Sequence, residues 1–457
     1  MPKSRPIEYA TCTAGELARA LAERDICAVE LFDAAVARIE AENPRINAVV
    51  VRDFDRARDA AKAADAALAR GEARPLLGVP MTVKESHRVA GLPASWGIAE
   101  HAGWTPRADS TGVTRLKAAG AVILGKTNIA TRLGDWHAAN AVYGRTNNPH
   151  DLNRTPGGSS GGAAAALATG MVPLELGSDI GGSIRVPAHF CGVFGHKPSY
   201  GLVPITGHAP PGVDADAASP EFDVIGPLAR TASDLDLALQ VLAGPDGDVA
   251  KAYRLTQPSA RAKRLADHRV LILDSHPCCA TDSQIKAALH RLGEALARAG
   301  AKVEFQSPLL PDLRAAHETY VRMLIVIVGR LQRRPDPIDA WAWMDGLDLI
   351  ATHRRRWAAL FEAFDVVLAP FGTAAFAHAD DVDWSQRTLM IDGEATPYGA
   401  QTAWPGTATF PGLPATCMPI SKKSDGLPIG VQVVGPRLED RTTIAFAELV
   451  EREIGLV

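Results

Sequence analysis

The sequence predicts an α/β protein, on two observations. Short apolar runs typical of strands alternate with amphipathic helical segments along most of the 457 residues. Repeated strand–helix–strand order is typical of a layered sheet covered by helices. Hydrophobic residues make up 47% of the chain and charged residues 22%, which is the composition of a soluble globular protein. Length by itself favours two domains, because one hydrophobic core rarely holds so many residues.

Charge, hydropathy and cysteine usage exclude several classes of protein. The net charge of −4 gives no sign of a nucleic-acid-binding surface. No apolar stretch approaches the length of a membrane span, and the N-terminal residues lack the apolar core of a signal peptide. The cysteines are scattered without metal-ligand spacing, so we expect reduced thiols and a cytoplasmic protein: Cys12, Cys27, Cys191, Cys278, Cys279 and Cys417.

Residues 1–72 are predicted to form helices that pack on a body built later in the chain. Thr13 and Glu16 have the spacing of a capping box and begin a helix that ends near Glu23. A second helix runs over residues 29–42, because its apolar residues fall on one face, and Pro44 is expected to end it. A third, alanine-rich helix spans residues 52–70.

The predicted sheet and its other helices lie in residues 73–457. Asp109 and Ser110 can cap a helix that Gly120 closes. Apolar runs and helical periodicity indicate the remaining elements. Strands are predicted at residues 77–84, 121–124, 172–176, 270–273, 302–305, 366–369 and 429–434, and helices at 163–167, 233–242, 283–299 and from about 441 onward.

Residues 120–127, GAVILGKT, match the phosphate-loop pattern G-x-x-x-x-G-K-[ST]. A phosphate loop needs a strand before its first glycine and a helix after its lysine. Here the predicted helix comes before Gly120, and residues 121–124 themselves form the strand, so their N–H groups would be used in the sheet. We therefore interpret the motif as a strand and keep nucleotide binding only as an alternative function.

The stretch from Gly157 to Tyr200 holds two serine sites flanked by glycines. The first, GGSSGG at residues 157–162, leads into a small-residue helix that Gly170 can end. Glycine raises the entropy cost of folding, so this density indicates close approach of the backbone to a reacting group. Taken alone, such a loop would instead indicate a linker.

The second serine site is a tight turn that ends at Ser183 and follows a predicted strand. A serine in such a turn can be held with several backbone N–H groups pointing one way, which is how an oxyanion hole is made. The base is harder to assign, because no flanking pattern selects either His189 or His196. Lys84 is the other candidate. It ends an apolar strand, where a lysine is costly unless it loses its proton or finds a partner.

These residues resemble the amidase signature family. The resemblance rests on GGSSGG, on GSDIGGSIR at residues 177–185 with Pro187 and FCG after it, and on Gly78-Val79-Pro80 leading to Lys84. It extends to GLPIGVQ at residues 426–432 and is thin between about 253 and 401. The spacing of the two serine sites agrees with the family as well. The resemblance implies one large domain with a mixed central β-sheet covered by helices on both faces.

The resemblance also implies a Ser-Ser-Lys triad. Ser183 would be the nucleophile, Ser159 the bridging serine and Lys84 the base. Neutral Lys84 would take a proton from Ser159 while Ser159 takes one from Ser183. Because the ordinary pKa of lysine is about 10.4, the site must lower it for the neutral amine to be present at neutral pH.

Three neighbouring side chains are expected to support the two turns and to take no part in the chemistry: Ser160 through a hydrogen bond, and Asp179 and Arg185 as an ion pair. The resemblance implies a cis peptide bond between Gly158 and Ser159. No metal or organic cofactor is expected, and a homodimer is compatible with the family. The oxyanion hole would be formed by the N–H groups of Ile180, Gly181, Gly182 and Ser183.

The predicted function is hydrolysis of a small-molecule carboxamide through a serine acyl-enzyme, with release of ammonia or an amine. Esters, anilides and carbamates present the same carbonyl and stay open as substrates, as does a role as the amidase subunit of a transamidating, glutamine-dependent amidotransferase complex. Substrate specificity is expected in the variable region 307–404, where the basic run Arg354–Arg356 indicates a solvated helix face. This region is rich in residues that often line apolar pockets: Trp341, Trp343, Trp357, Trp384 and Trp404.

Overall fold

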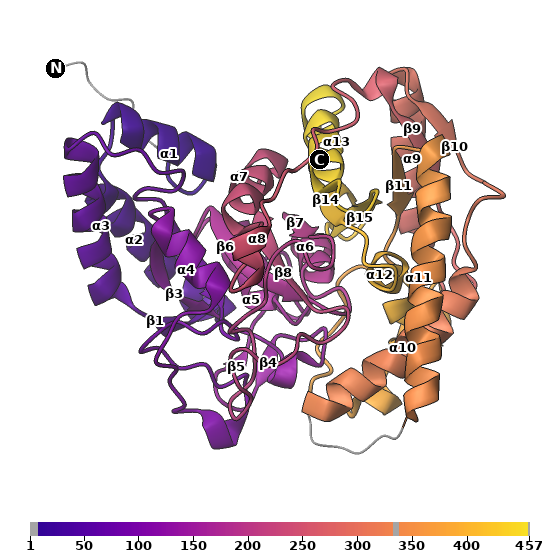
Figure 1. The fold of residues 1–457 in the computed structure, drawn as a ribbon, viewed down its shortest axis with the longest axis horizontal. Helices are drawn as coiled ribbons and strands as arrows, with labels where there is room; N and C mark the ends of the chain where they lie inside the picture. The colour runs from indigo at the N-terminus through magenta and orange to yellow at the C-terminus, as the bar shows by residue number, and fades with distance from the viewer. Residues whose placement is uncertain (1–7, 332–337, 456–457) are drawn as a thin grey trace.

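The main feature of the structure, a computed structural model that describes residues 8–331 and 338–455, is a mixed sheet of 11 strands (Figure 1). Its strand order is β1-β3-β2-β6-β8-β7-β14-β15-β11-β9-β10. The strands are β1 (Val49–Arg52), β2 (Pro80–Lys84), β3 (Val122–Thr127), β6 (Leu174–Asp179), β7 (Phe194–Lys197), β8 (Val224–Ala229), β9 (Arg269–Ile272), β10 (Lys302–Glu304), β11 (Val366–Ala369), β14 (Ala415–Lys422) and β15 (Pro428–Val434).

The sheet contains parallel and antiparallel pairs. β2 lies parallel to both β3 and β6, and β9 lies parallel to both β10 and β11. The strands between these two groups, from β8 to β15, pair antiparallel. Two short hairpins lie outside the sheet: β4 (Ala139–Asn140) with β5 (Gly144–Arg145), and β12 (Thr388–Ile391) with β13 (Glu394–Pro397). The prediction of one mixed sheet is therefore confirmed.

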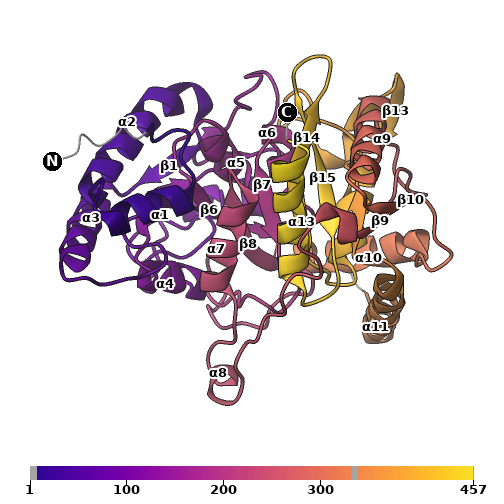
Figure 2. The ribbon, with the colours of Figure 1, turned by 90° about the horizontal axis from the view of Figure 1, so that it is seen from above.

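Helices cover both faces of the sheet. The helices are α1 (Ala14–Glu23), α2 (Ala28–Ile46), α3 (Phe54–Ala69), α4 (Thr111–Ala118), α5 (Gly161–Ala168), α6 (Arg185–Cys191), α7 (Ala232–Leu242), α8 (Val249–Ala252), α9 (Ser283–Arg298), α10 (Leu313–Leu331), α11 (Ala340–Ala363), α12 (Ala403–Thr409) and α13 (Asp440–Glu453). Figure 2 shows α7 and α13 side by side along the sheet, and they contact each other.

Neighbouring residues of β6 show which helices share a face. Successive side chains of a strand point to opposite faces. A Cβ atom at Gly177 would lie 3.1 Å from Ser160 Oγ, next to α5. Leu176 points the other way, since its Cδ2 atom would lie 3.1 Å from a Cβ atom at Gly112 of α4. The two glycine–serine motifs therefore lie on the face opposite α4.

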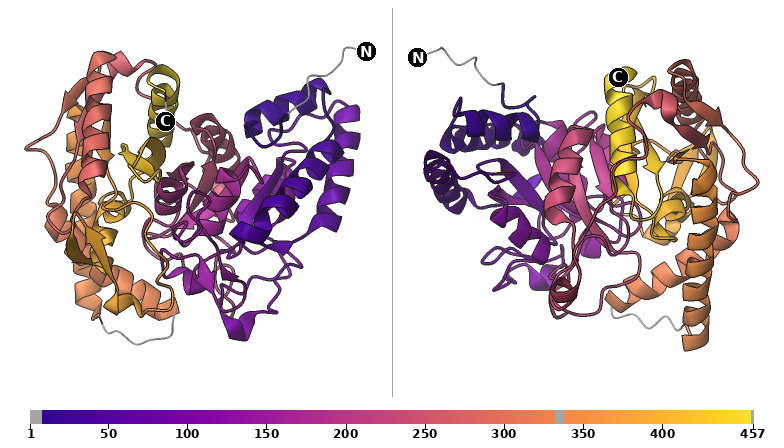
Figure 3. Two further views of the ribbon diagram at one scale, coloured as in Figure 1. Left: turned by 180° about the vertical axis from the view of Figure 1, so that it is seen from behind. Right: turned by 45° about the horizontal axis from the view of Figure 1, so that its top comes forward.

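The two ends of the sheet carry different helices. Figures 1 and 3 show α1 to α3, in indigo, at the β1 end and α10 and α11, in orange, at the β10 end. The variable region 307–404 thus contributes two long helices, of which the sequence pattern predicts only the helical segment at Arg354–Arg356 in α11. In the part of the chain that the structure describes, no helix is long and apolar enough to cross a membrane.

Two boundaries differ from the prediction at the N-terminal end. The capping box of Thr13 and Glu16 is confirmed, but α2 continues through Pro44 to Ile46. A proline in the last turn removes one N–H group, and the helix ends only where Asn47 adopts a left-handed conformation with φ 58°. The predicted helix at 52–70 begins later, at Phe54, because Val49–Arg52 forms β1 against β3.

The basic run on α11 is only partly a solvated face. Arg355 and Arg356 are exposed, as predicted. Arg354 is partly buried, and its Nε atom donates to the carbonyl of Pro411 at 3.0 Å. The exposed part of the run is therefore shorter than the sequence predicts.

Candidate active site

Lys84 lies at the carboxyl end of β2, inside the sheet, with 0% of its surface exposed. Its Nζ atom is 2.7 Å from Ser159 Oγ and 2.9 Å from Ser178 Oγ. The carbonyl of Ser178, on the neighbouring strand β6, lies 3.4 Å from the same nitrogen. The amine is therefore held by three oxygen atoms inside the protein.

Burial lowers the pKa of Lys84 from 10.5 to about 7. Three carboxylates oppose this shift by stabilising the ammonium form, those of Asp223, Asp179 and Glu175. A substantial fraction of Lys84 is therefore neutral at neutral pH, which meets the requirement for a base.

The glycine–serine loop (residues 157–160) brings Ser159 to this lysine. The peptide between Gly158 and Ser159 is cis, as the resemblance implies. A Cβ atom at Gly158 would lie 2.5 Å from the carbonyl oxygen of Asp135, so only glycine fits there. The Ser160 amide donates to the Ser183 carbonyl at 3.2 Å, which fastens this loop to the turn that carries Ser183.

The Ser183 turn (residues 180–184) joins β6 to α6 and is organised by one carboxylate. Asp179 accepts from the Gly182 amide at 2.9 Å and from Arg185 Nε and Nη2 at 3.0 and 2.9 Å. Burial alone would raise the pKa of the Asp179 carboxyl, but the Arg185 guanidinium lowers it to about 2. The two residues form a buried ion pair.

The N–H group of Gly182 was predicted to belong to an oxyanion hole, but in the structure it has a partner within the protein. That N–H group donates to Asp179 Oδ1 and is therefore directed at the carboxylate. Among the described residues, none accepts a hydrogen bond from the N–H groups of Ile180, Gly181 and Ser183. These three donors are available to a bound molecule.

Two aromatic side chains that the sequence pattern did not single out hold the carbonyl groups of the Ser183 turn. The Tyr320 hydroxyl, from α10, donates to the Ile180 carbonyl at 2.8 Å. The Trp136 indole N–H donates to the Gly181 carbonyl at 3.1 Å. Since the carbonyl of Ile180 and the N–H of Gly181 belong to one planar peptide, Tyr320 fixes the direction of that N–H group.

Arg185 connects the turn to the C-terminal part of the sheet. Its Nη1 atom donates to Gln432 Oε1 at 2.8 Å, and its Nη2 atom donates to Thr409 Oγ1 at 2.8 Å. Gln432 belongs to the GLPIGVQ motif on β15. The contact between Gln432 and Arg185 has no local signal in the sequence, because the two segments lie far apart along the chain. The contact between Ser178 and Lys84 likewise has no local signal.

The two histidines considered as bases are held in other networks. His189 Nε2 lies 2.9 Å from the carbonyl of Thr373, and the Gly430 amide donates to its Nδ1 atom at 2.6 Å. His196 Nε2 lies 3.1 Å from Asp440 Oδ1. Both rings are buried. The structure brings Lys84, and neither histidine, to Ser159.

A cavity of about 380 Å³, the Ser183 cavity, opens beside the nucleophile candidate. It lies between the Ser183 turn and the second half of α10. Its described lining residues are Leu133, Gly134, Asp135, Trp136, Ile180, Gly181, Ser183, Leu324, Ile325, Val328, Gly329, Trp384, Tyr398 and Thr402. No cluster of three or more His, Cys, Asp or Glu side chains within residues 8–331 and 338–455 is arranged to hold a metal ion.

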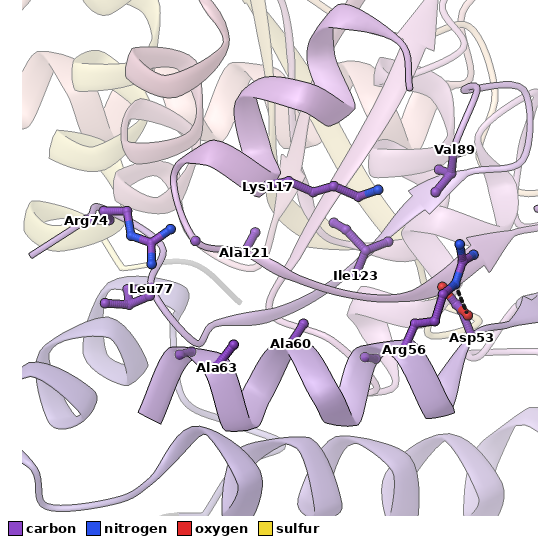
Figure 4. A pocket seen from close by; sticks show the side chains of 13 residues that line it. Asp53, Arg56, Ala60, Ala63, Arg74, Leu77, Val89, Lys117, Ala121 and Ile123 are labelled. Carbon is purple, nitrogen blue, oxygen red and sulfur yellow. Dashed lines mark hydrogen bonds and ion pairs between the residues drawn. The ribbon is translucent and has the colours of Figure 1, made fainter. Parts of the chain in front are cut away.

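A separate cavity, with a volume of about 350 Å³, lies between α3 and β3, beside the phosphate-loop-like residues 120–123. Figure 4 shows the side chains that line it. Residues 122–127 of that motif form β3, and Lys126 is buried and donates to the Pro93 carbonyl. The geometry of a phosphate loop is therefore missing at this motif. The basic side chains at this cavity are each paired with a carboxylate: Arg56 with Asp53, Lys117 with Asp109 and Arg74 with Glu72.

Comparison with known proteins agrees with this geometry. The Amidase family profile matches residues 30–346 and 338–444. Putative amidase AmiB2 of Mycobacterium tuberculosis is 34% identical over 477 residues, which cover 98% of this chain and 97% of that protein. A glutamyl-tRNA(Gln) amidotransferase subunit of Roseiflexus castenholzii is 32% identical over 488 residues, which cover 96% and 95%. A bacterial aryl acylamidase of the amidase signature family has a similar structure, with a TM-score of 0.80 and 26% identity over 96% of both chains. The chain therefore belongs to the amidase signature family, whose members act on carbon–nitrogen bonds.

Proposed function

We propose that this amidase cleaves carboxamides through an acyl-enzyme on Ser183, with Ser159 as the bridging serine and Lys84 as the base. The observation that carries the proposal is the buried 2.7 Å contact between Lys84 Nζ and Ser159 Oγ. The hydrogen bond from the Ser160 amide to Ser183 supports it, because that bond keeps the two serine turns together.

The surroundings of Lys84 favour one direction of proton transfer. A neutral amine has two N–H groups and one lone pair. The two N–H groups can donate to the hydroxyl and the carbonyl of Ser178, which lie 2.9 and 3.4 Å away. The lone pair then faces Ser159, whose O–H group donates to it. Ser178 is thus a positioning residue for the base.

We propose the following steps for Ser183, Ser159 and Lys84. Ser183 Oγ attacks the amide carbon as its proton passes to Ser159, and the Ser159 proton passes to Lys84. When the C–N bond breaks, Ser159 gives its proton to the leaving nitrogen and takes one back from Lys84. Water then attacks the acyl-enzyme through the same relay and releases the acid, which regenerates Ser183.

The negative charge that develops on the carbonyl oxygen needs donors. We assign this role to the N–H groups of Ile180, Gly181 and Ser183, because none of them is used within the described part of the chain. Loss of one such donor typically costs about 3–4 kcal/mol of barrier. The Gly182 N–H group already donates to Asp179, so we assign Gly182 to the support of the turn, together with Arg185 and Ser160.

A sulfonyl fluoride such as phenylmethanesulfonyl fluoride tests the assignment of the nucleophile. An activated serine attacks the sulfur, forms an S–O bond and expels fluoride, whereas ordinary serines react slowly. Intact-mass and fragment spectra are expected to show one adduct per chain, on Ser183, and none on a Ser183→Ala variant. An adduct on Ser159 with Ser183 unmodified would reverse the two roles.

The pH dependence of activity is expected to follow Lys84. Because the base must be neutral, kcat/KM should rise as the pH increases through about 7, the pKa of this amine. Asp223 raises that pKa, so Asp223→Asn is expected to move the acidic limb of the profile to lower pH. The matched control is Asp216→Asn, at an exposed position of the same loop. A limb that stays in place or moves to higher pH in Asp223→Asn would contradict Lys84 as the titrating base.

Two alternatives from the sequence stay proposals. Esters, anilides and carbamates present the same carbonyl to Ser183. Similarity to the amidotransferase protein of Roseiflexus castenholzii favours the second alternative, delivery of ammonia to a partner protein. Dependence of turnover on an added partner would support that role. Cytoplasmic residence is proposed on the six unpaired cysteines, and a homodimer is proposed on the family resemblance alone.

A further inference from the structure

We infer that the Ser183 cavity holds the acyl part of the substrate and selects an uncharged, aromatic acyl group. The inference rests on the proposed role of Ser183 and names the substrate class of the same site. Two observations carry it. The cavity lies beside Ser183 and is not lined by Ser159 or Lys84, and the polar side chains that line it already have hydrogen-bond partners within the protein.

The position of the cavity assigns it to the acyl group. The leaving nitrogen must face Ser159, because Ser159 returns the proton to it. The cavity is lined by Ile180, Gly181 and Ser183, and none of its described lining residues is Lys84, Ser159 or Ser178. A carbonyl bound in the oxyanion hole with its nitrogen toward Ser159 therefore directs its acyl substituent into this cavity.

The polar side chains around the cavity are already used inside the protein. Asp135 Oδ1 accepts from the Tyr398 hydroxyl at 2.7 Å, and Asp135 Oδ2 accepts from Arg387 Nη1 at 2.6 Å. The Trp136 indole donates to the Ser183 turn, and the Thr402 hydroxyl donates to a backbone carbonyl at 2.8 Å. A polar substrate group would lose its hydrogen bonds to water and find few partners in exchange, which is unfavourable.

The walls offer apolar and aromatic surface instead. Leu324 and Val328, one turn apart on α10, form one wall. Tyr398 forms another, and the rings of Trp136 and Trp384 meet its ring edge-on at centroid distances of 6.0 and 5.7 Å. Trp384 is 45% exposed although it lines the cavity, so a bound ring can cover apolar surface that now faces water.

The same lining disfavours glutamine and other acyl groups that carry a carboxylate. No lysine, arginine or histidine is among the described residues that line the cavity. The Asp135 carboxylate is already paired with the Arg387 guanidinium, so neither charge is left for a substrate. A substrate carboxylate would therefore be desolvated without an unpaired cation among the described lining residues to bind it.

Two amides of similar length test the inference: 3-phenylpropanamide, which ends in a ring, and glutaramate, which ends in a carboxylate. L-Glutamine is the third substrate. We expect kcat/KM for the phenyl amide to exceed that for either carboxylated amide by about 100-fold or more. Equal or faster Ser183-dependent turnover of glutaramate or glutamine would overturn the inference and leave the proposed chemistry intact.

Variants then show whether this cavity makes the selection. Trp384→Ala is expected to lower kcat/KM for the phenyl amide about 10-fold and to leave acetamide, which has no ring, nearly unchanged. Val328→Arg should reverse the preference, because it adds a cation to the wall. The matched control is Trp341→Ala, on α11, a tryptophan that is 82% exposed and does not line the cavity. If Trp384→Ala behaves like Trp341→Ala toward both amides, the acyl group binds elsewhere.

Binding to the Ser183→Ala variant separates the proposed chemistry of Ser183 from the inferred selectivity of the cavity. Calorimetry is expected to show that 3-phenylpropanamide binds and that glutaramate does not, with Val328→Arg reversing the order. If no amide is hydrolysed but this selectivity is present, the proposed function fails and the inference about the cavity stands. If neither amide binds while the wild type hydrolyses both alike, the inference fails.

Discussion

Ser183→Ala is expected to lower kcat/KM for every amide substrate by about 10⁴-fold or more, because the variant has no oxygen to form the acyl-enzyme. The N–H groups of Ile180 and Gly181 and the Ser183 cavity would persist, so substrate should still bind. Ammonia or amine release, measured with protein free of host amidase, checks this result. Retained turnover would mean that a different group attacks the carbonyl.

A folding control belongs to this experiment. The Ser183 hydroxyl makes no hydrogen bond to another described residue, so its removal should change the free energy of unfolding by no more than about 0.5 kcal/mol. Ser233→Ala, at an exposed position of α7, is the matched serine variant and should keep full activity. A large loss of stability in Ser183→Ala would make its lost activity uninformative about chemistry.

Lys84→Met is expected to lower kcat about 10²- to 10⁴-fold and at the same time to stabilise the fold. The pKa of Lys84 lies at about 7 in the folded protein and at 10.5 in its ordinary state, so the folded protein binds fewer protons between these pH values. Its stability therefore falls as the pH drops from about 10.5 to about 7, and the full penalty is present below that window. Methionine has a similar volume and no charge, which removes the penalty.

The expected gain in the free energy of unfolding is about 1–3 kcal/mol at pH 6, since the lost contacts with Ser159 and Ser178 offset part of it. The gain should shrink as the pH rises above 7. Denaturant titrations at several pH values measure both trends. Lys126→Met is the matched control, because Lys126 is also buried and its pKa is lowered by burial to about 8, yet it lies outside the Ser183 cavity and the Lys84 contacts. Lys126→Met should gain stability and keep its activity.

Local patterns predicted much of the fold. The parallel strands β2, β3 and β6 are short apolar runs bounded by glycines or prolines, and their places in the sequence were predicted within a few residues. The strands β7, β8 and β14 were not predicted. They contain Gly195, Pro227 and Pro419, residues that sequence rules take as strand breakers. Pairing with neighbours far along the chain overrides that weak local preference.

The tryptophan-rich region shows where local pattern carries no information. The five tryptophans could not be told apart in the sequence, yet Trp357 and Trp404 are buried in a core, Trp341 is exposed and Trp384 lines the Ser183 cavity. A tryptophan's environment is decided by the surface it meets, which lies on other elements.

By itself, the sequence determined the candidate reactive groups: two serines in glycine-rich turns and one lysine at the end of an apolar strand. Glycines mark such turns locally because no Cβ atom fits, and an apolar run around a lysine already indicates that its ammonium form is disfavoured. Only the tertiary structure decided that Ser178 holds Lys84, that Asp179 occupies the Gly182 amide, and that Tyr320 and Trp136 fix the carbonyls of the Ser183 turn. Most of these contacts join distant segments, and all depend on side-chain directions that appear only when the sheet and α10 pack together.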